Sequence, residues 1–192
     1  RIVEIANVLG LDSVPRMKAV VVSGHLGAAR SFPVISRTAS EGHIYGGFAF
    51  SRFDLFMIAG LRADGMVHEV THLLIEEVVG SPLAKVPAWL NEGLAMYFEV
   101  EAQAQDERMA QAVRDDALIN MRSMGTVPGR PADVAIFYAQ SYSIVKHLID
   151  VYGPERVSPL LNGLDEGLSI DVALQSSHGF GLKELERNWK DD

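Results

Sequence analysis

The chain has 192 residues, and its 25 acidic and 17 basic side chains give a formal net charge of −8. This negative balance, with no cluster of Lys or Arg, excludes proteins that bind nucleic acid through its phosphates. Cysteine is absent, which excludes disulfides, iron–sulfur clusters, cysteine nucleophiles and thiolate zinc sites. No stretch reaches the ~20 apolar residues that a membrane-spanning helix needs.

The N-terminal third of the chain predicts a short helix followed by strands. Residues 2–9 can form the helix. Short apolar runs bounded by Gly, Ser or Pro favour strands at 17–22, 44–50 and 54–58. We therefore expect a small mixed β-sheet within about residues 15–60.

From Asp64 onward the pattern becomes helical. Asp64 is a candidate N-cap for a helix that ends at Gly80-Ser81-Pro82. Pro159 is expected to interrupt one of the later helices. The later helices are predicted at 87–102, 106–124, 131–152, about 154–164, 169–177 and 182–190.

The order of these elements predicts the fold class. Strands followed by helices are typical of α+β proteins. The length favours a single domain over residues 1–192, with a mainly β part at 1–63 and a mainly α part at 64–192.

The most specific motif is His68-Glu69-Val70-Thr71-His72, in the first predicted helix after the strands. Residues four apart lie on one face of a helix, so both imidazoles can reach one metal ion, and zinc is the usual ion for this pattern. The carboxylate of Glu69 can reach water at that ion and act as a general base. The alternative is a helix without metal, in which two histidines fall four apart by chance.

A catalytic zinc site needs a third protein ligand, with water in the fourth position. Glu92 is the candidate, on the next predicted helix, 20 residues after His72. A short loop containing Gly and Pro would bring that helix back beside the histidines. The alternative is a solvated Glu near a helix start, where the helix dipole favours acids.

Two segments carry a resemblance to a known family. HEVTH (68–72) followed by WLNEGLA (89–95) resembles the gluzincin zinc metallopeptidases, which include aminopeptidase N-like and thermolysin-like catalytic domains and the bacterial peptidase MA-like domain. The likeness is strongest over residues 64–101, and residues 180–189 resemble the end of the peptidase MA-like domain. The resemblance implies a zincin-like α+β fold and one Zn²⁺ ion. By this resemblance His68, His72 and Glu92 are the zinc ligands and Glu69 is the base.

The resemblance also implies roles for two residues outside these motifs. Tyr138 is similar in register to a tyrosine that donates a hydrogen bond to the oxyanion in aminopeptidase N-like enzymes, and packing is its alternative role. Glu99 matches a glutamate that can hold a ligand histidine by its second ring nitrogen, and its alternative is a surface position. The segment 46–50 is a candidate edge strand for an extended substrate. An acidic anchor for a free amine is not evident from the sequence.

These features together predict a zinc-dependent peptidase that acts on a peptide or protein substrate. The alternative is a non-catalytic domain that keeps the zincin fold and its metal for binding. The family resemblance and a first residue other than Met favour a place outside the cytoplasm, secreted or tethered to the envelope. The sequence leaves open the substrate, internal or terminal cleavage, the oligomeric state, and the roles of His25, His43, His147 and His178, the last of which is expected at a helix C-terminus.

Overall fold

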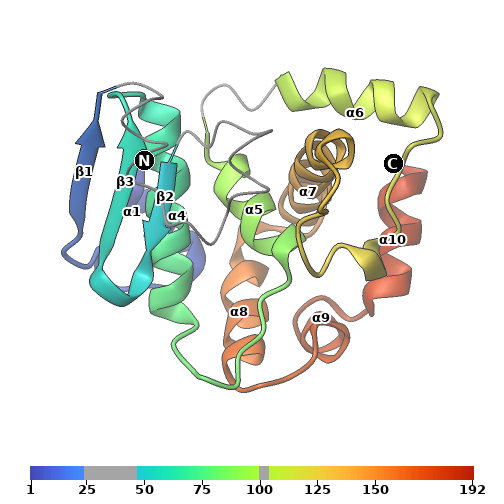
Figure 1. The fold of residues 1–192 in the computed structure, drawn as a ribbon. Coiled ribbons are helices and arrows are strands. Elements are labelled where there is room, and N and C mark those ends of the chain that lie inside the picture. Colours follow the sequence, from blue (N-terminus) through green and yellow to red (C-terminus); the bar gives the residue numbers. More distant parts are fainter. Residues whose placement is uncertain (24–46, 100–103) are drawn as a thin grey trace.

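The computed structural model describes residues 1–23, 47–99 and 104–192, and the statements below concern these ranges. A small sheet lies at one end of the molecule and helices make up the rest (Figure 1). The elements are α1 (Ile2–Leu9), β1 (Lys18–Val22), β2 (Gly47–Phe50), β3 (Leu55–Ala59), α4 (Ala63–Val78), α5 (Ala88–Tyr97), α6 (Ala104–Arg114), α7 (Pro131–Tyr152), α8 (Val157–Asp165), α9 (Ile170–His178) and α10 (Leu182–Asp191).

The sheet has three described strands in the order β1-β3-β2. β1 runs parallel to β3 and β2 runs antiparallel to it, with Phe50 opposite Leu55 and Gly47 opposite Ile58. Along β3, Phe56 and Ile58 are buried while their neighbours are half-buried, which is the alternation of a sheet with one face on a core. The predicted small mixed sheet is therefore confirmed, and its partner in packing is α4.

The helices continue the core away from the sheet. α5 packs against both α4 and α7, and α8 packs against α9 (Figure 1). The apolar stripe of α4, which includes Val67, Val70 and Leu74, enters this core. A sheet on one side and helices on the other confirm the α+β, zincin-like prediction.

Several helix boundaries differ from the predictions for local reasons. α5 ends at Tyr97, before the predicted end, and residues 100–103 lie outside the described ranges. The helix predicted over 106–124 stops at Arg114, because Asp116 adopts φ 51°, a left-handed conformation that an α-helix cannot continue. Met121 instead lies in a separate 3₁₀ turn.

Two predictions, one about a helix cap and one about a proline inside a helix, also need correction. α4 begins at Ala63, so Asp64 lies in the first turn and the N-cap is Arg62. Pro159 does not interrupt its helix, because it is the third residue of α8. In the first turn of a helix the backbone N–H has no intrahelical partner, so proline is tolerated there.

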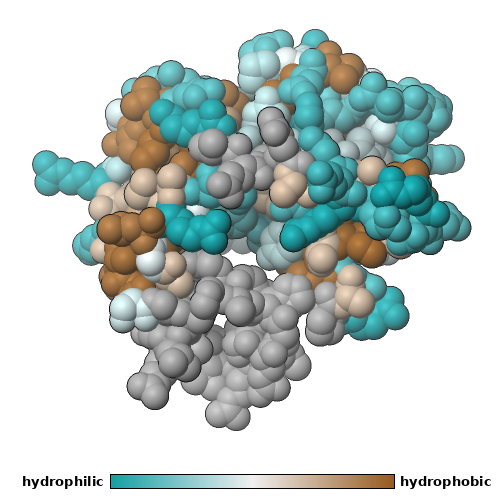
Figure 2. Space-filling view, turned by 90° about the horizontal axis from the view of Figure 1, so that it is seen from above, coloured by the Kyte–Doolittle hydropathy of each residue, from teal (hydrophilic) through white to brown (hydrophobic). Residues whose placement is uncertain are grey.

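The surface differs between the two ends of the molecule. Seen from above, hydrophobic residues gather over the strands, whereas the side that carries α6 is mostly hydrophilic (Figure 2). Val21 of β1 is among the exposed hydrophobic residues. Of the helices that the structure describes, none combines the length and apolarity needed to cross a membrane.

His178 ends α9, as expected, and is buried among aromatic rings. Gly179 follows it in the left-handed conformation that terminates the helix. Nδ1 of His178 lies 2.8 Å from Ser177 Oγ, and the imidazole ring lies against Tyr152 and Phe180. Burial, together with the Arg156 guanidinium, lowers the pKa of His178 to about 4.

This depressed pKa predicts a loss of stability in acid. Above pH ~6.5 the imidazole is neutral in both states, and below it the unfolded chain gains the proton first. The contribution of neutral His178 is therefore lost as the pH falls from about 6.5 towards 4. The contribution is measured as the free energy of unfolding of the wild type minus that of His178→Gln, from denaturant unfolding followed by circular dichroism. This difference should shrink by about 1–2 kcal/mol between pH 7 and pH 4.5. A difference that stays constant with pH would contradict the assignment.

Candidate metal centre and cleft

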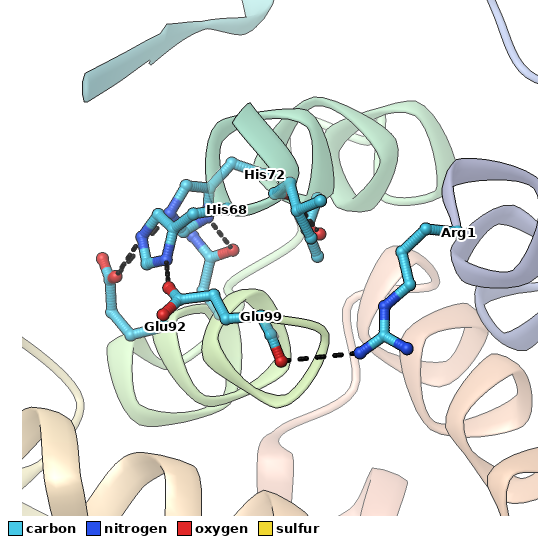
Figure 3. A network of polar contacts seen from close by, with 8 residues as sticks. Arg1, His68, His72, Glu92 and Glu99 are labelled. Atoms are coloured by element: carbon cyan, nitrogen blue, oxygen red, sulfur yellow. Dashed lines mark hydrogen bonds and ion pairs between the residues drawn. The ribbon is translucent and has the colours of Figure 1, made fainter. Parts of the chain in front are cut away.

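Helices α4 and α5 bring His68, His72 and Glu92 together. One ligand atom from each of these residues lies within 4.8 Å of the other two. Oε2 of Glu92 is 3.4 Å from Nε2 of His68 and 3.6 Å from Nε2 of His72 (Figure 3). The two imidazole rings stand edge to face, with centroids 4.8 Å apart. Two imidazole nitrogens and a carboxylate oxygen thus converge on one point.

The other nitrogen of each ring is held by a residue of α5 or its C-terminal end. Nδ1 of His68 lies 2.7 Å from Oε1 of Glu99, and Nδ1 of His72 lies 3.0 Å from Oδ1 of Asn91. Both oxygens accept hydrogen bonds, so each Nδ1 carries a hydrogen and each Nε2 is turned towards Glu92. These contacts orient both rings towards Glu92.

A glycine places Glu92 at this distance from the histidines. A Cβ at Gly93 would meet Ser141 O of α7 at 2.4 Å and Val145 Cγ2 at 2.5 Å. The residue after Glu92 therefore has to be glycine for α5 to lie this close to α7. The side chain of Glu92, about 100° further round α5, lies close to His68 and His72 of α4.

Glu69 lies beside the three convergent residues and is buried, with 6 % of its surface exposed. A Cβ at Gly47 of β2 would meet Glu69 Cγ at 2.6 Å and Oε1 at 2.7 Å. The edge of the sheet therefore packs closely against the Glu69 carboxylate, and a side chain at residue 47 would displace that carboxylate. Gly47 thus leaves the space that Glu69 occupies.

The charges of this group shift the pKa values of its members. Burial alone would lower the pKa of His68, but its hydrogen bonds to Glu92 and Glu99 outweigh burial and raise the pKa to about 10. Burial lowers the pKa of His72 despite the nearby charge of Glu92. Burial raises the pKa of Glu69 to about 7, and the charges of Glu92 and Glu99 act in the same direction against that of His68. For Glu92, contact with His68 overcomes burial and lowers the pKa.

These residues line a hollow of about 260 Å³ that opens to solvent. One wall is the edge strand β2, and the opposite wall is formed by α4, α5 and Tyr138 of α7. The hollow is lined by Gly47, Phe48, Ala49, Ser51, His68, Glu69, His72, Glu76, Asn91, Glu92 and Tyr138. A ligand that enters it would touch a strand edge, a buried carboxylate and the convergent nitrogen and oxygen atoms together.

A sequence model of the Peptidase MA superfamily matches residues 40–192, which is most of the chain and includes every residue that lines this hollow. The chain belongs to the Peptidase MA superfamily. No curated protein and no solved structure matches the chain significantly. The predicted peptidase MA-like domain is thereby confirmed, and the narrower likeness to aminopeptidase N-like and thermolysin-like enzymes stays a prediction.

Domains of the Peptidase MA superfamily are peptidase-like and generally metal-dependent. The donor set of this chain fits such a metal, because two imidazole nitrogens and a carboxylate oxygen are the ligands that zinc takes in hydrolytic sites. The fit extends to the hydrogen bonds of the two Nδ1 atoms, which orient both Nε2 atoms towards Glu92. A cation bound there would replace the proton that His68 Nε2 shares with Glu92. His68, His72 and Glu92 are therefore able to hold a divalent cation.

The remaining residues predicted for the site in this Peptidase MA domain lie in or beside it. Tyr138 lines the hollow, and its ring packs edge-on against Phe137. Glu99 contacts His68 as described above. His25 and His43 lie outside the described residues. His147 and His178 do not line the hollow, and Nδ1 of His147 instead lies 3.0 Å from Asp192.

Two residues that hold groups of the site were not predicted from the sequence, and one of them, Arg1, lies outside the matched residues 40–192. Asn91 holds His72, and its position directly before Glu92 was the available signal. Arg1 donates from Nε to the Phe98 carbonyl at 2.9 Å and reaches the Glu99 carbonyl at 3.5 Å, so it binds the end of the helix that carries the acids (Figure 3). Nothing in the local sequence around Arg1 indicates this contact.

The close packing at Gly93 generates a stability prediction. Gly93→Ala forces α5 and α7 apart and should lower the free energy of unfolding by about 1–3 kcal/mol. Gly65→Ala is a matched control, because it also lies inside a helix and a Cβ there meets nothing within 4 Å. The control should leave stability unchanged or raise it by up to about 1 kcal/mol. Denaturant unfolding measures both, and equal effects of the two substitutions would contradict the packing argument.

Proposed function

We propose that the chain is a zinc-dependent peptidase whose residues 1–192 act as a single catalytic domain. The observation that carries this proposal is the convergence of His68 Nε2, His72 Nε2 and Glu92 Oε2 in a hollow that also contains the buried carboxylate of Glu69. In this proposal His68, His72 and Glu92 hold one Zn²⁺ ion. When bound, zinc activates water for attack and withdraws electrons from a carbonyl oxygen.

Glu69 is the proposed general base. It takes a proton from the attacking water and returns that proton to the leaving amine as the peptide bond breaks. Burial raises the pKa of Glu69 to about 7, and a cation held by the neighbouring residues would lower it, which leaves the carboxylate ionised and able to accept the proton. Because residue 47 is glycine, the carboxylate of Glu69 can stay in this position during both proton transfers.

Three further residues support this chemistry in the proposal. The hydroxyl of Tyr138, which lines the same hollow, donates a hydrogen bond to the oxygen that becomes negative. Glu99 and Asn91 fix the tautomer and the orientation of the two histidines. Their role is to position the rings, and they do not touch the reacting atoms.

In this proposal the main chain of the substrate pairs with strand β2. β2 is at the edge of the described sheet, and its residues Gly47, Phe48 and Ala49 line the hollow. An extended peptide can pair with such an edge through main-chain hydrogen bonds. Pairing would lay a peptide bond across the hollow, beside Glu69.

The first test replaces the proposed base. Glu69→Gln keeps the size of the side chain but cannot take the proton, so peptide hydrolysis should fall by roughly 10³-fold or more while zinc stays bound. Cleavage of a peptide library, analysed by mass spectrometry, measures the activity, and elemental analysis measures the zinc. Glu166→Gln, an exposed residue at the end of α8, is the control and should retain both.

Two results would contradict the proposal in different ways. Full activity in Glu69→Gln would overturn the assigned mechanism. Zinc bound by the wild type, with no hydrolysis of any library peptide, would favour the non-catalytic binding domain instead.

The second test addresses the two residues that hold the histidines. Asn91→Ala or Glu99→Ala should weaken zinc binding by 10- to 100-fold, because the ring that loses its partner is no longer oriented. Competition with a chromophoric chelator measures the affinity, and Glu166→Ala serves as the control. Unchanged zinc affinity in both variants would show that the rings are held by packing alone.

A further inference from the structure

The hollow at the candidate metal centre continues into a second one. This second hollow has a volume of about 320 Å³ and shares Ser51 and Glu76 with the first. Its other lining residues come from the segment before β1, the turn after β2, the second half of α4 and the loop that follows α4. They are Pro15, Arg16, Met17, Arg52, Asp54, Leu73, Glu77 and Gly80. We call these two adjoining hollows the cleft, and Glu76 lines both of them.

The positions along this cleft follow from the paired course of β2 and α4. Gly47, the first residue of β2, abuts Glu69, whereas Ser51, just after β2, shares both hollows with Glu76. Strand and helix therefore run in the same direction along the cleft. Glu76 lies four residues after His72, hence one helical turn further along the same face.

This geometry sets which part of a substrate meets Glu76. A peptide added antiparallel to β2 runs from Ser51 towards Gly47, and antiparallel pairing is slightly more stable per residue than parallel pairing. The part of the peptide that precedes the bond beside Glu69 then lies next to Glu76. The part that follows this bond lies towards Gly47.

The charge of Glu76 is not balanced within the described protein. Its side chain is exposed and makes no ion pair or hydrogen bond with another described residue. In the first hollow the other ionisable groups, apart from Tyr138, are the proposed ligands and base. In the second hollow Arg16 and Arg52 face three carboxylates, those of Asp54, Glu76 and Glu77, so no positive excess is available to neutralise it.

We propose that Glu76 selects peptides with a cationic group in the part of the chain that precedes the cleaved bond. The group is either a free α-amine or the side chain of Lys or Arg, because an ammonium or guanidinium ion can pair with the carboxylate in the same way. This inference rests on the proposed peptidase function and names its substrate class. It also supplies the acidic residue that was not evident from the sequence.

The experiment compares matched pairs of peptides. One pair has both ends blocked and carries Lys or Met before the cleaved bond, and the other has a neutral first residue with a free or an acetylated N-terminus. Wild type should prefer the cationic member of at least one pair by roughly fivefold in kcat/KM, and Glu76→Gln should reduce this preference to within about twofold. A preference in the blocked pair alone identifies a basic side chain, and one in the second pair alone identifies a free amine.

Controls separate this inference from the proposed function. Glu166→Gln should retain the preference of the wild type. Equal cleavage of both members of each pair, or a preference that persists in Glu76→Gln, overturns the role of Glu76 and leaves the peptidase function intact. If the wild type cleaves no peptide, the proposed function fails. In that case fluorescence anisotropy tests the role of Glu76 by measuring how the same peptides bind to zinc-loaded Glu69→Gln and to zinc-loaded Glu69→Gln that also carries Glu76→Gln. If Glu69→Gln prefers the cationic peptides and the double variant does not, the role of Glu76 is supported. If the preference is the same in both variants or absent from both, that role is overturned.

Discussion

The close approach of α5 to α7 at Gly93 determines where Glu92 lies relative to the histidines of α4. A methyl group at residue 93 would overlap the main chain of Ser141, so the two helices can approach this closely only with glycine there. Glu92 is the preceding residue on the same helix, so the position of α5 against α7 also helps to set the distance between its carboxylate and Nε2 of both histidines on α4. A second glycine, Gly47, does the same for Glu69 from the side of the sheet. Two residues without side chains thus set the positions of two acids.

The group also places several acidic side chains close together, so their charge has to be balanced. Three carboxylates, those of Glu69, Glu92 and Glu99, surround two histidines in a partly buried space, and burying charge is costly unless it is paired. In the structure His68 meets this need, since its two acidic neighbours raise its pKa to about 10. A divalent cation between the Nε2 atoms and Glu92 would take over that role. Glu76, outside the ligand set, would still be available for a charge on the substrate.

Local patterns made much of this arrangement predictable. The helical spacing of apolar residues predicted α4, and the four-residue separation of the histidines needs only a helix to bring them together. Glu92 was found from the motif around it. Asn91 was missed although it is next to Glu92, because its role depends on the angle at which α5 faces α4. Glu76 was missed because its place in the cleft depends on where β2 lies, and the break at Asp116 was missed because apolar spacing continues across it.

Arg1 shows that the surroundings of the site are assembled over very different distances along the chain. The contact between His68 and Glu99 joins residues 31 apart, whereas the contact between Arg1 and the Phe98 carbonyl spans 97 residues. Closing the longer loop costs about 1 kcal/mol more in chain entropy. The hydrogen bonds around the histidines can therefore form within an α4–α5 hairpin early in folding, before α1 docks. The contact of Arg1 with the end of α5 would then form late in folding, after the proposed metal-binding residues are already in place.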